Sequence, residues 1–193
     1  MEEILAFDKQ WFLAINNGLA SPFLDWLCPI LRNQAVWYVP YALLVYFFYK
    51  NYGVNTWKIL LVVALMIFVS DQFSANLIKK TFMRIRPCSE PGLHGMVRHL
   101  ISSCNGYSFV SAHATNHFAL ALFLIYYFKH ISLWVIPVAI VWALAISFSQ
   151  IYVGVHYPLD VICGGLIGVL FGISFAKYSL KYIKPALINN IKE

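Results

Sequence analysis

The chain has 193 residues, of which 61% are hydrophobic and only 11% are charged. About a quarter of the residues of a soluble domain are normally charged, so the composition excludes an ordinary soluble globular protein. The net charge of +6 does not indicate nucleic-acid binding, because Lys and Arg stand in short blocks between apolar runs, as at the flanks of membrane segments. The length suits a single helical bundle without an additional soluble domain.

Six apolar stretches predict membrane segments, because about 20 helical residues cross the hydrocarbon core. Asn16, Asn17 and Pro22 interrupt the first stretch, so part of it is expected to lie flat in the interface, which would leave five segments. We predict an all-α polytopic membrane bundle with about six segments in one domain, residues 1–193. Its N-terminal interfacial or first membrane segment is residues 1–33, and its motif-bearing core is residues 57–176. The stretches lie near residues 10–31, 34–49, 59–78, 111–128, 132–153 and 158–176.

The distribution of positive charges predicts the orientation. With six segments, eight lysines share one side and six cations the other, and two of those six are assigned below to substrate. The excess places both termini in the cytoplasm, with the acidic start Met1-Glu2-Glu3 arguing against a cleavable signal peptide. The eight are Lys9, Lys50, Lys58, Lys129, Lys177, Lys181, Lys184 and Lys192, and the six are Arg32, Lys79, Lys80, Arg84, Arg86 and Arg98.

The polar loop of residues 83–110 then faces outward, toward the periplasm if the source is a bacterium. Cys88 and Cys104 bracket much of this loop. In an oxidising compartment a disulfide between them would stabilise the loop by about 3 kcal/mol. Cys28 and Cys163 lie in apolar segments, where cysteine behaves as a small hydrophobic residue.

The first polar cluster closes the third stretch and holds Lys79, Arg86 and Pro87. Lys79 and Arg86 are seven positions apart, or two helical turns, so both are expected to project from nearly the same helix face. Pro87 disfavours helix at the preceding residue, which places Arg86 at the helix end. A guanidinium fork and an ammonium charge suit a phosphate, although a basic membrane flank is the alternative reading.

The second cluster opens the fourth stretch with Ser111, Ala112 and His113. Ser111 is a good N-cap, and the free amides that follow it form an anion site. His113 is expected in the first helical turn, beside any bound phosphate. An ordinary helix cap with interfacial histidines is the alternative.

The third cluster joins the last two stretches and contains Gln150, His156, Pro158 and Asp160. Pro158 suits the first turn of a helix, which places His156 just before the helix and Asp160 inside its first turn. A carboxylate there can hold the Nδ1–H of the imidazole and leave Nε2 free to attack. Complementing the helix dipole would explain the Asp alone, but would leave an ionisable His without a role near the membrane.

All three clusters reach one face of an alternating bundle. Two cations, a helix N-terminus and two histidines, one of them backed by a carboxylate, form a phosphoryl-transfer site. We expect neither a metal nor another cofactor, because the carboxylates are scattered and no His-Glu-x-x-His spacing occurs.

These clusters resemble the type 2 phosphatidic acid phosphatase family, whose pattern is K-x6-RP, then PSGH, then SR-x5-H-x3-D. The matching segments are Lys79-x6-Arg86-Pro87, Val110-Ser111-Ala112-His113 and Ser149-Gln150-x5-His156-x3-Asp160. The resemblance implies metal-independent hydrolysis of a lipid phosphate or diphosphate by a membrane helical bundle, with the bilayer and the lipid as its partners.

The family scheme also implies roles for these residues. His156 attacks phosphorus to give a phosphohistidine, Asp160 orients it, and His113 protonates the leaving oxygen. The phosphoryl oxygens are held by Lys79, Arg86, Ser111 and backbone amides at Ala112, with Gln150 at the position of the family arginine.

Two positions depart from the family pattern. Ala112 replaces a glycine, which is a mild change unless the backbone needs positive φ. Gln150 replaces an arginine, and a neutral amide cannot supply the charge-assisted hydrogen bonds of a guanidinium. Losing one such clamp costs about 3 kcal/mol, or about a hundredfold in rate, unless Arg84 or Arg98 compensates.

Undecaprenyl diphosphate is the substrate that we expect first, because the small six-helix format resembles bacterial proteins that recycle this carrier. Phosphatidylglycerophosphate, phosphatidic acid and lipid A 1-phosphate remain open. A lipid-phosphate binding or transport protein weakened by Gln150 is the alternative from another class, and vanadate-dependent haloperoxidase chemistry is a third reading. The oligomeric state is not written in the sequence.

Overall fold

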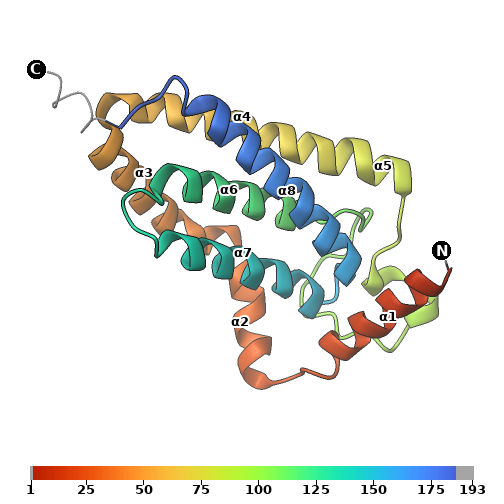
Figure 1. Cartoon of the computed structure of the whole chain (residues 1–193). Coiled ribbons are helices and arrows are strands. Elements are labelled where there is room, and N and C mark those ends of the chain that lie inside the picture. Colours follow the sequence, from red (N-terminus) through yellow and green to blue (C-terminus); the bar gives the residue numbers. More distant parts are fainter. Residues whose placement is uncertain (1, 186–193) are drawn as a thin grey trace, which may run out of the picture.

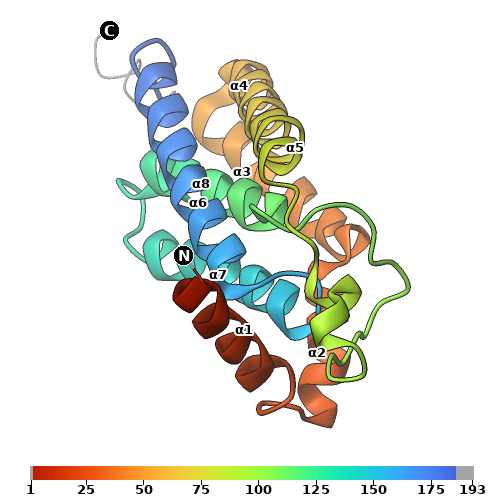
Figure 2. The same ribbon diagram turned by 90° about the vertical axis from the view of Figure 1, so that its right-hand side faces the viewer.

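Helices account for nearly all the regular structure of the chain, and the longer ones run alongside one another (Figures 1 and 2). The computed structural model describes residues 2–185. The α-helices are α1 Glu2–Asn16, α2 Pro22–Arg32, α3 Tyr38–Tyr52, α4 Thr56–Asp71, α5 Lys79–Phe82, α6 Ala112–Phe128, α7 Val135–Tyr152 and α8 Pro158–Ser179. The shorter turns are η1 Gln34–Trp37, η2 Gly53–Asn55, η4 Pro87–Ser89 and η5 Pro91–Leu93, and a π-helical turn, η3 Gln72–Ile78, joins α4 to α5.

Three helical stretches in the described residues are long and apolar enough to cross a membrane: Gln34–Leu93, Val135–Tyr152 and Pro158–Ser179. The first contains both α3 and the run from α4 to α5, and the chain turns back between them at Gly53, whose φ is +54°. The prediction of an all-α polytopic helical bundle is therefore confirmed.

The pair α6 and α8 forms the centre of the bundle, and glycines on α8 allow the two helices to approach closely. A Cβ atom added to Gly164 would lie 2.6 Å from the carbonyl oxygen of Ser111, and one added to Gly168 or Gly172 would overlap the α6 backbone. Small residues have this role in membrane bundles because they bring helix backbones into van der Waals contact. This contact fixes the start of α8 against the start of α6.

Aromatic packing ties α3 to α6 at the end of the bundle away from these two helix starts. Phe48, Tyr52 and Tyr127 are buried, and the Tyr52 hydroxyl donates a 2.9 Å hydrogen bond to the carbonyl oxygen of Tyr127. Phe128 packs against Phe48 with the ring centroids 4.6 Å apart. One large apolar cluster therefore lies at this end of the bundle, and the polar clusters lie at the other.

The expectation of one membrane segment over residues 10–31 is wrong. The chain forms two helices there, of 15 and 11 residues, which are too short to cross the hydrocarbon core. Polar groups bind α1 beside the start of α8: Asp8 Oδ1 accepts from the Leu159 amide at 2.9 Å, and Asn16 Nδ2 donates to the Tyr152 carbonyl at 2.7 Å.

The prediction that both termini are cytoplasmic stays a prediction. Glu2 begins α1 at the end of the bundle that holds the polar clusters, whereas α8 ends at Ser179 at the opposite end (Figure 1). Lys192, counted in that expectation, lies outside the described residues.

The loop from Met83 to Val110 covers the polar end of the bundle and is tied to α1 and α2. The Arg98 amide donates to Asn16 Oδ1 at 2.8 Å, and Arg98 Nη2 contacts both carboxylate oxygens of Asp25 at 2.6 and 2.7 Å. The structure joins Cys88 to Cys104 by a disulfide, with the Cα atoms 6.2 Å apart.

Candidate active site

His156 lies in the turn between α7 and α8, and its side chain is 2% exposed. The amides of Val155 and His156 both donate to the carbonyl oxygen of Gln150 at 3.2 Å, which closes the turn at the end of α7. Gly154 has φ +91°, and a Cβ there would meet the carbonyl oxygen of Arg98 at 2.9 Å, so a side chain is excluded. The backbone therefore fixes the position of the imidazole.

Asp160 lies in the first turn of α8, beside the imidazole of His156. Its Oδ2 lies 3.4 Å from His156 Nδ1 and accepts a 2.8 Å hydrogen bond from the Tyr157 amide. The 3.4 Å separation is longer than a strong hydrogen bond. The carboxylate faces Nδ1, which leaves Nε2 as the nitrogen available for chemistry.

Arg84 forms ion pairs with two buried carboxylates, those of Asp160 and Asp8. Its Nη1 contacts Asp160 Oδ1 and its Nη2 contacts Asp8 Oδ2, both at 2.7 Å. The guanidinium also lies over the Tyr157 ring, 4.0 Å from the centroid. Sequence reasoning missed Asp8, although a carboxylate within an otherwise apolar stretch of α1 was a usable indication.

Arg86 approaches the free nitrogen of His156. Its Nη1 lies 3.5 Å from His156 Nε2 and donates to the Val155 carbonyl at 3.3 Å. Lys79 is the first residue of α5, and Arg86 and Asp160 are among its charged neighbours. The structure thus places Arg86 beside Nε2 of His156 and gives His156 Lys79 as a further charged neighbour.

The N-terminus of α6 forms another wall of the site. Ser111 caps the helix, with its Oγ accepting from the Ala114 amide at 3.4 Å and its own amide donating to the Asp160 carbonyl at 2.9 Å. In the first turn of a helix the remaining amides have no intrahelical partner, so those of Ala112 and His113 are available to bind an anion.

His113 follows the cap, with His156, Arg32 and Lys79 among its charged neighbours. Its carbonyl oxygen accepts from His117 Nδ1 at 2.8 Å, and the two imidazole rings are parallel, with centroids 6.3 Å apart. The structure therefore brings His113 to the same end of the bundle as the pair of His156 and Asp160.

Gln150 is fully buried, and neither atom of its side-chain amide has a hydrogen-bond partner within residues 2–185. Position 150 thus contributes no charge. Neither arginine expected to compensate is free to do so, because Arg84 is bound to Asp8 and Asp160, and Arg98, in the loop before α6, is bound to Asp25 of α2.

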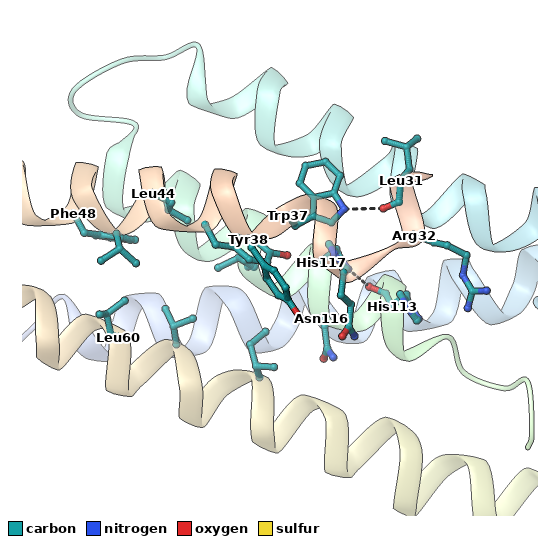
Figure 3. A pocket seen from close by; sticks show the side chains of 16 residues that line it. Leu31, Arg32, Trp37, Tyr38, Leu44, Phe48, Leu60, His113, Asn116 and His117 are labelled. Atoms are coloured by element: carbon teal, nitrogen blue, oxygen red, sulfur yellow. Dashed lines mark hydrogen bonds between the residues drawn. The ribbon is translucent and has the colours of Figure 1, made fainter. Parts of the chain in front are cut away.

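An apolar pocket of about 390 Å³ opens beside His113, between α2, α3, α4 and α6. Figure 3 shows Arg32, His113 and His117 at one end of this pocket and Phe48 and Leu60 toward the other. A ligand with a polar head and an apolar tail matches this division.

A possible metal site in the described residues is the group of Cys88, His99 and Cys104, whose ligand atoms lie within 4.8 Å of one another. The disulfide between the two cysteines consumes the thiolates that a metal would need. This group therefore does not fit a metal ion while the bridge is intact.

Residues 55–184, which contain all three clusters, match the model of the PAP2 superfamily. The chain belongs to this family. It is therefore an integral membrane lipid-phosphate phosphatase, and the predicted relationship to the type 2 phosphatidic acid phosphatases and the predicted hydrolase class are confirmed.

Two similar proteins are bacterial and carry the same name. The lipid A 4'-phosphatase of Bacteroides thetaiotaomicron is 30% identical over 91% of this chain and 78% of its own length. The lipid A 4'-phosphatase of Porphyromonas gingivalis is 33% identical over 89% of this chain and 72% of its own length.

Solved structures agree with this assignment. Aquifex aeolicus LpxE superposes with a TM-score of 0.64 at 27% identity, over 88% of this chain and 94% of the other. A phosphatidylglycerolphosphate phosphatase of the PAP2 type from Bacillus subtilis superposes with a TM-score of 0.71 over 95% of this chain and 90% of the other. At 19% identity the second likeness shows the fold alone.

Proposed function

We propose that the chain removes a phosphate group from lipid A, with the 4' position favoured. The observation that supports this most strongly is the similarity, along about nine-tenths of the chain, to two proteins named lipid A 4'-phosphatase. Undecaprenyl diphosphate, expected first from the sequence, has weaker support. The undecaprenyl-diphosphatase BcrC of Bacillus subtilis is 27% identical over 53% of this chain.

His156 is the nucleophile in this proposal. Burial lowers the pKa of His156, which lies in the turn outside the membrane helices, to about 4. The imidazole is therefore neutral at pH 7, and the contact between Nδ1 and Asp160 directs the Nε2 lone pair toward the substrate.

The reaction has two steps. His156 Nε2 forms a bond to phosphorus while the bond from phosphorus to the ester oxygen breaks, and His113 gives that oxygen a proton. Water then attacks phosphorus and gives a proton to His113, the N–P bond breaks, and inorganic phosphate leaves.

The charge that develops on the phosphoryl oxygens is balanced by residues around Nε2. In this proposal Lys79 and Arg86 supply the positive charge, and the first amides of α6, at Ala112 and His113, supply hydrogen bonds. Ser111 acts chiefly through its cap, because its amide is bound to Asp160 and its Oγ to Ala114.

The apolar pocket beside His113 supports a lipid substrate. Its walls carry Leu44, Phe48, Leu60 and Val63, which match the acyl chain of a lipid and do not match a water-soluble sugar phosphate. We infer that one acyl chain lies between α3 and α4 while the phosphate head reaches His113.

We also infer five membrane crossings, by α3, the run from α4 to α5, α6, α7 and α8, with the site facing outward. Within the described part of the chain, several cations at the site end are bound in ion pairs: Lys9 with Glu90, Arg84 with Asp8 and Asp160, and Arg98 with Asp25. Lysines dominate the opposite end, as in cytoplasmic loops. The N-terminus is then periplasmic and the C-terminus cytoplasmic.

Phosphate release from purified protein tests the proposed substrate. The panel contains lipid A bisphosphate, lipid A with only the 1-phosphate or only the 4'-phosphate, undecaprenyl diphosphate, phosphatidic acid and phosphatidylglycerophosphate, each in EDTA. We expect fastest release from lipid A carrying the 4'-phosphate, and loss of that release in His156→Ala. Preference for undecaprenyl diphosphate would overturn the substrate, equal release by His156→Ala would overturn the mechanism, and strong inhibition by EDTA would overturn its independence of metal.

A further inference from the structure

Arg32 is one of two arginines in the described residues that have no carboxylate partner. It is the last residue of α2 and is half-buried, and its Nε is buried without a hydrogen-bond partner among residues 2–185. Arg84 and Arg98 both bind carboxylates. Within the described chain only Arg32 and Arg86 lack a carboxylate partner, and Arg86 faces the nucleophilic nitrogen of His156.

These two arginines gather around one space. Arg32 is a charged neighbour of both Arg86 and His113, and it lines the pocket beside His113 (Figure 3). Burial lowers the pKa of Arg32. Arg86 also has the ammonium of Lys79 as a charged neighbour. Neighbouring positive charges repel one another unless an anion lies between them.

The turn after α2 holds Arg32 in place. Trp37 Nε1 donates to the Leu31 carbonyl at 2.7 Å, and Asn33 Oδ1 accepts from the Ala35 amide at 3.1 Å. A basic residue at a helix C-terminus can also simply complement the helix dipole. Complementing the helix dipole does not require Arg32 to have a buried Nε or to line the pocket of His113. An arginine that only flanks a membrane helix would instead extend toward the lipid headgroups.

We propose that Arg32 binds the phosphoryl group of the substrate and takes the part that the family pattern gives to an arginine at position 150. The clamp then consists of Lys79, Arg86 and Arg32, with the third cation supplied by α2 instead of α7. The buried, neutral Gln150 is consistent with this, because position 150 supplies no cation of its own. The inference rests on the proposed phosphoryl transfer at His156, and it is independent of which lipid is the substrate.

Binding of orthovanadate, measured by calorimetry on the whole detergent-solubilised protein, tests this proposal without a lipid. Arg32→Gln removes the charge and retains much of the side chain, and Arg32→Lys retains the charge without the fork. We expect Kd to rise about a hundredfold in Arg32→Gln and about tenfold in Arg32→Lys. Lys80→Ala, which removes an exposed cation from the same end of the bundle, is expected to bind as the unaltered protein does.

Arg86→Ala separates the two levels of the proposal. The proposed phosphoryl site is wrong if orthovanadate does not bind measurably to the unaltered protein. It is also wrong if Arg86→Ala binds orthovanadate as tightly as the unaltered protein does. If Arg86→Ala binds weakly while Arg32→Gln binds as the unaltered protein does, the site stands and the role of Arg32 is overturned.

Position 150 supplies a second and independent test. The double variant Arg32→Gln/Gln150→Arg is expected to recover orthovanadate binding to within about tenfold of the unaltered protein. Gln150→Arg alone is expected to improve binding by less than about threefold, because Arg32 already fills the third place in the clamp. A gain of a hundredfold in the single variant would show that this place is empty. Thermal unfolding of each variant confirms that it is folded.

Discussion

The backbone amide of Ser111 donates a 2.9 Å hydrogen bond to the carbonyl oxygen of Asp160. This bond joins the first residue before α6 to the first turn of α8, so the helix that carries His113 and the residue that orients His156 are fixed to each other. The bond is possible because the two helix backbones lie in close contact. Residue 164 must be a glycine for this contact, since a Cβ there would overlap the carbonyl oxygen of Ser111.

The variant Gly164→Ala therefore separates the two halves of the site. A Cβ at this position would lie 2.6 Å from the Ser111 carbonyl oxygen and must push α8 away from α6. Misplacement by about 1 Å can cost about a hundredfold in rate, so we expect kcat for phosphate release to fall by about that factor. Gly92→Ala is the matched control, since its Cβ would meet only Glu90 Oε1 at 3.9 Å. Equal rates in the two variants would contradict this role of the helix contact.

Asp8→Ala tests the carboxylate pair around Arg84. Removing one partner of a buried ion pair costs about 3 kcal/mol, and the freed Arg84 is expected to shift Asp160 away from His156. We expect a lower free energy of unfolding and a kcat about tenfold lower, with KM changed little. Lys9→Ala removes a more exposed pair with Glu90 from the same helix and should change neither. An unaltered kcat in Asp8→Ala would show that Asp8 has no positioning role.

The pH dependence of His156 follows from its burial, which lowers the pKa of its imidazole to about 4. The neutral form, which attacks phosphorus, is then complete above about pH 5 and is lost as the pH falls through 4. Titration of the imidazole by NMR on protein with isotope-labelled histidine, with His156→Gln to assign the resonance, measures this directly. A midpoint near the ordinary value of 6.5 would contradict the buried, neutral nucleophile.

Removal of the disulfide tests the loop that covers the site. The double variant Cys88→Ser/Cys104→Ser opens a loop with a sequence separation of 16 residues, and we expect the free energy of unfolding to fall by about 3 kcal/mol. Dithiothreitol should destabilise the unaltered protein equally and leave the double variant unaffected. Cys163→Ala, on α8, is the control. If dithiothreitol has no effect on the unaltered protein, the bridge is not formed.

Much of this organisation could be predicted from the sequence because it follows from the spacing of polar residues along the chain. Asp160 follows His156 by four positions, which places both residues at the start of α8. The prediction that Lys79 and Arg86 share a helix face is wrong, because α5 ends at Phe82 and the backbone of Arg86 is extended. The alternation of long helices then brings clusters from distant parts of the chain to one end of the bundle, as the structure shows (Figure 2).

The N-terminal part could not be predicted in the same way. Apolar composition does not distinguish a membrane segment from two short helices that pack on the end of the bundle, and only long-range contacts such as that of Asn16 with Tyr152 decide between them. For the same reason the sequence did not indicate Asp8, and Arg32 was counted only for the orientation. Asp8 contacts Arg84 and Leu159, and Arg32 lines the pocket of His113. These residues are far apart in the sequence, and no local spacing indicates that they meet.

The most direct test of the central claim is to trap the phosphoryl group on the protein. Purified protein is mixed with lipid A in EDTA, quenched in base within milliseconds, digested, and examined by mass spectrometry, with His156→Gln as the control. We predict a phosphoryl group on the Nε2 atom of His156 in the unaltered protein and none on the corresponding peptide of the variant. Phosphate release at the unaltered rate by His156→Gln, or a phosphoryl group carried by another residue, would contradict the account.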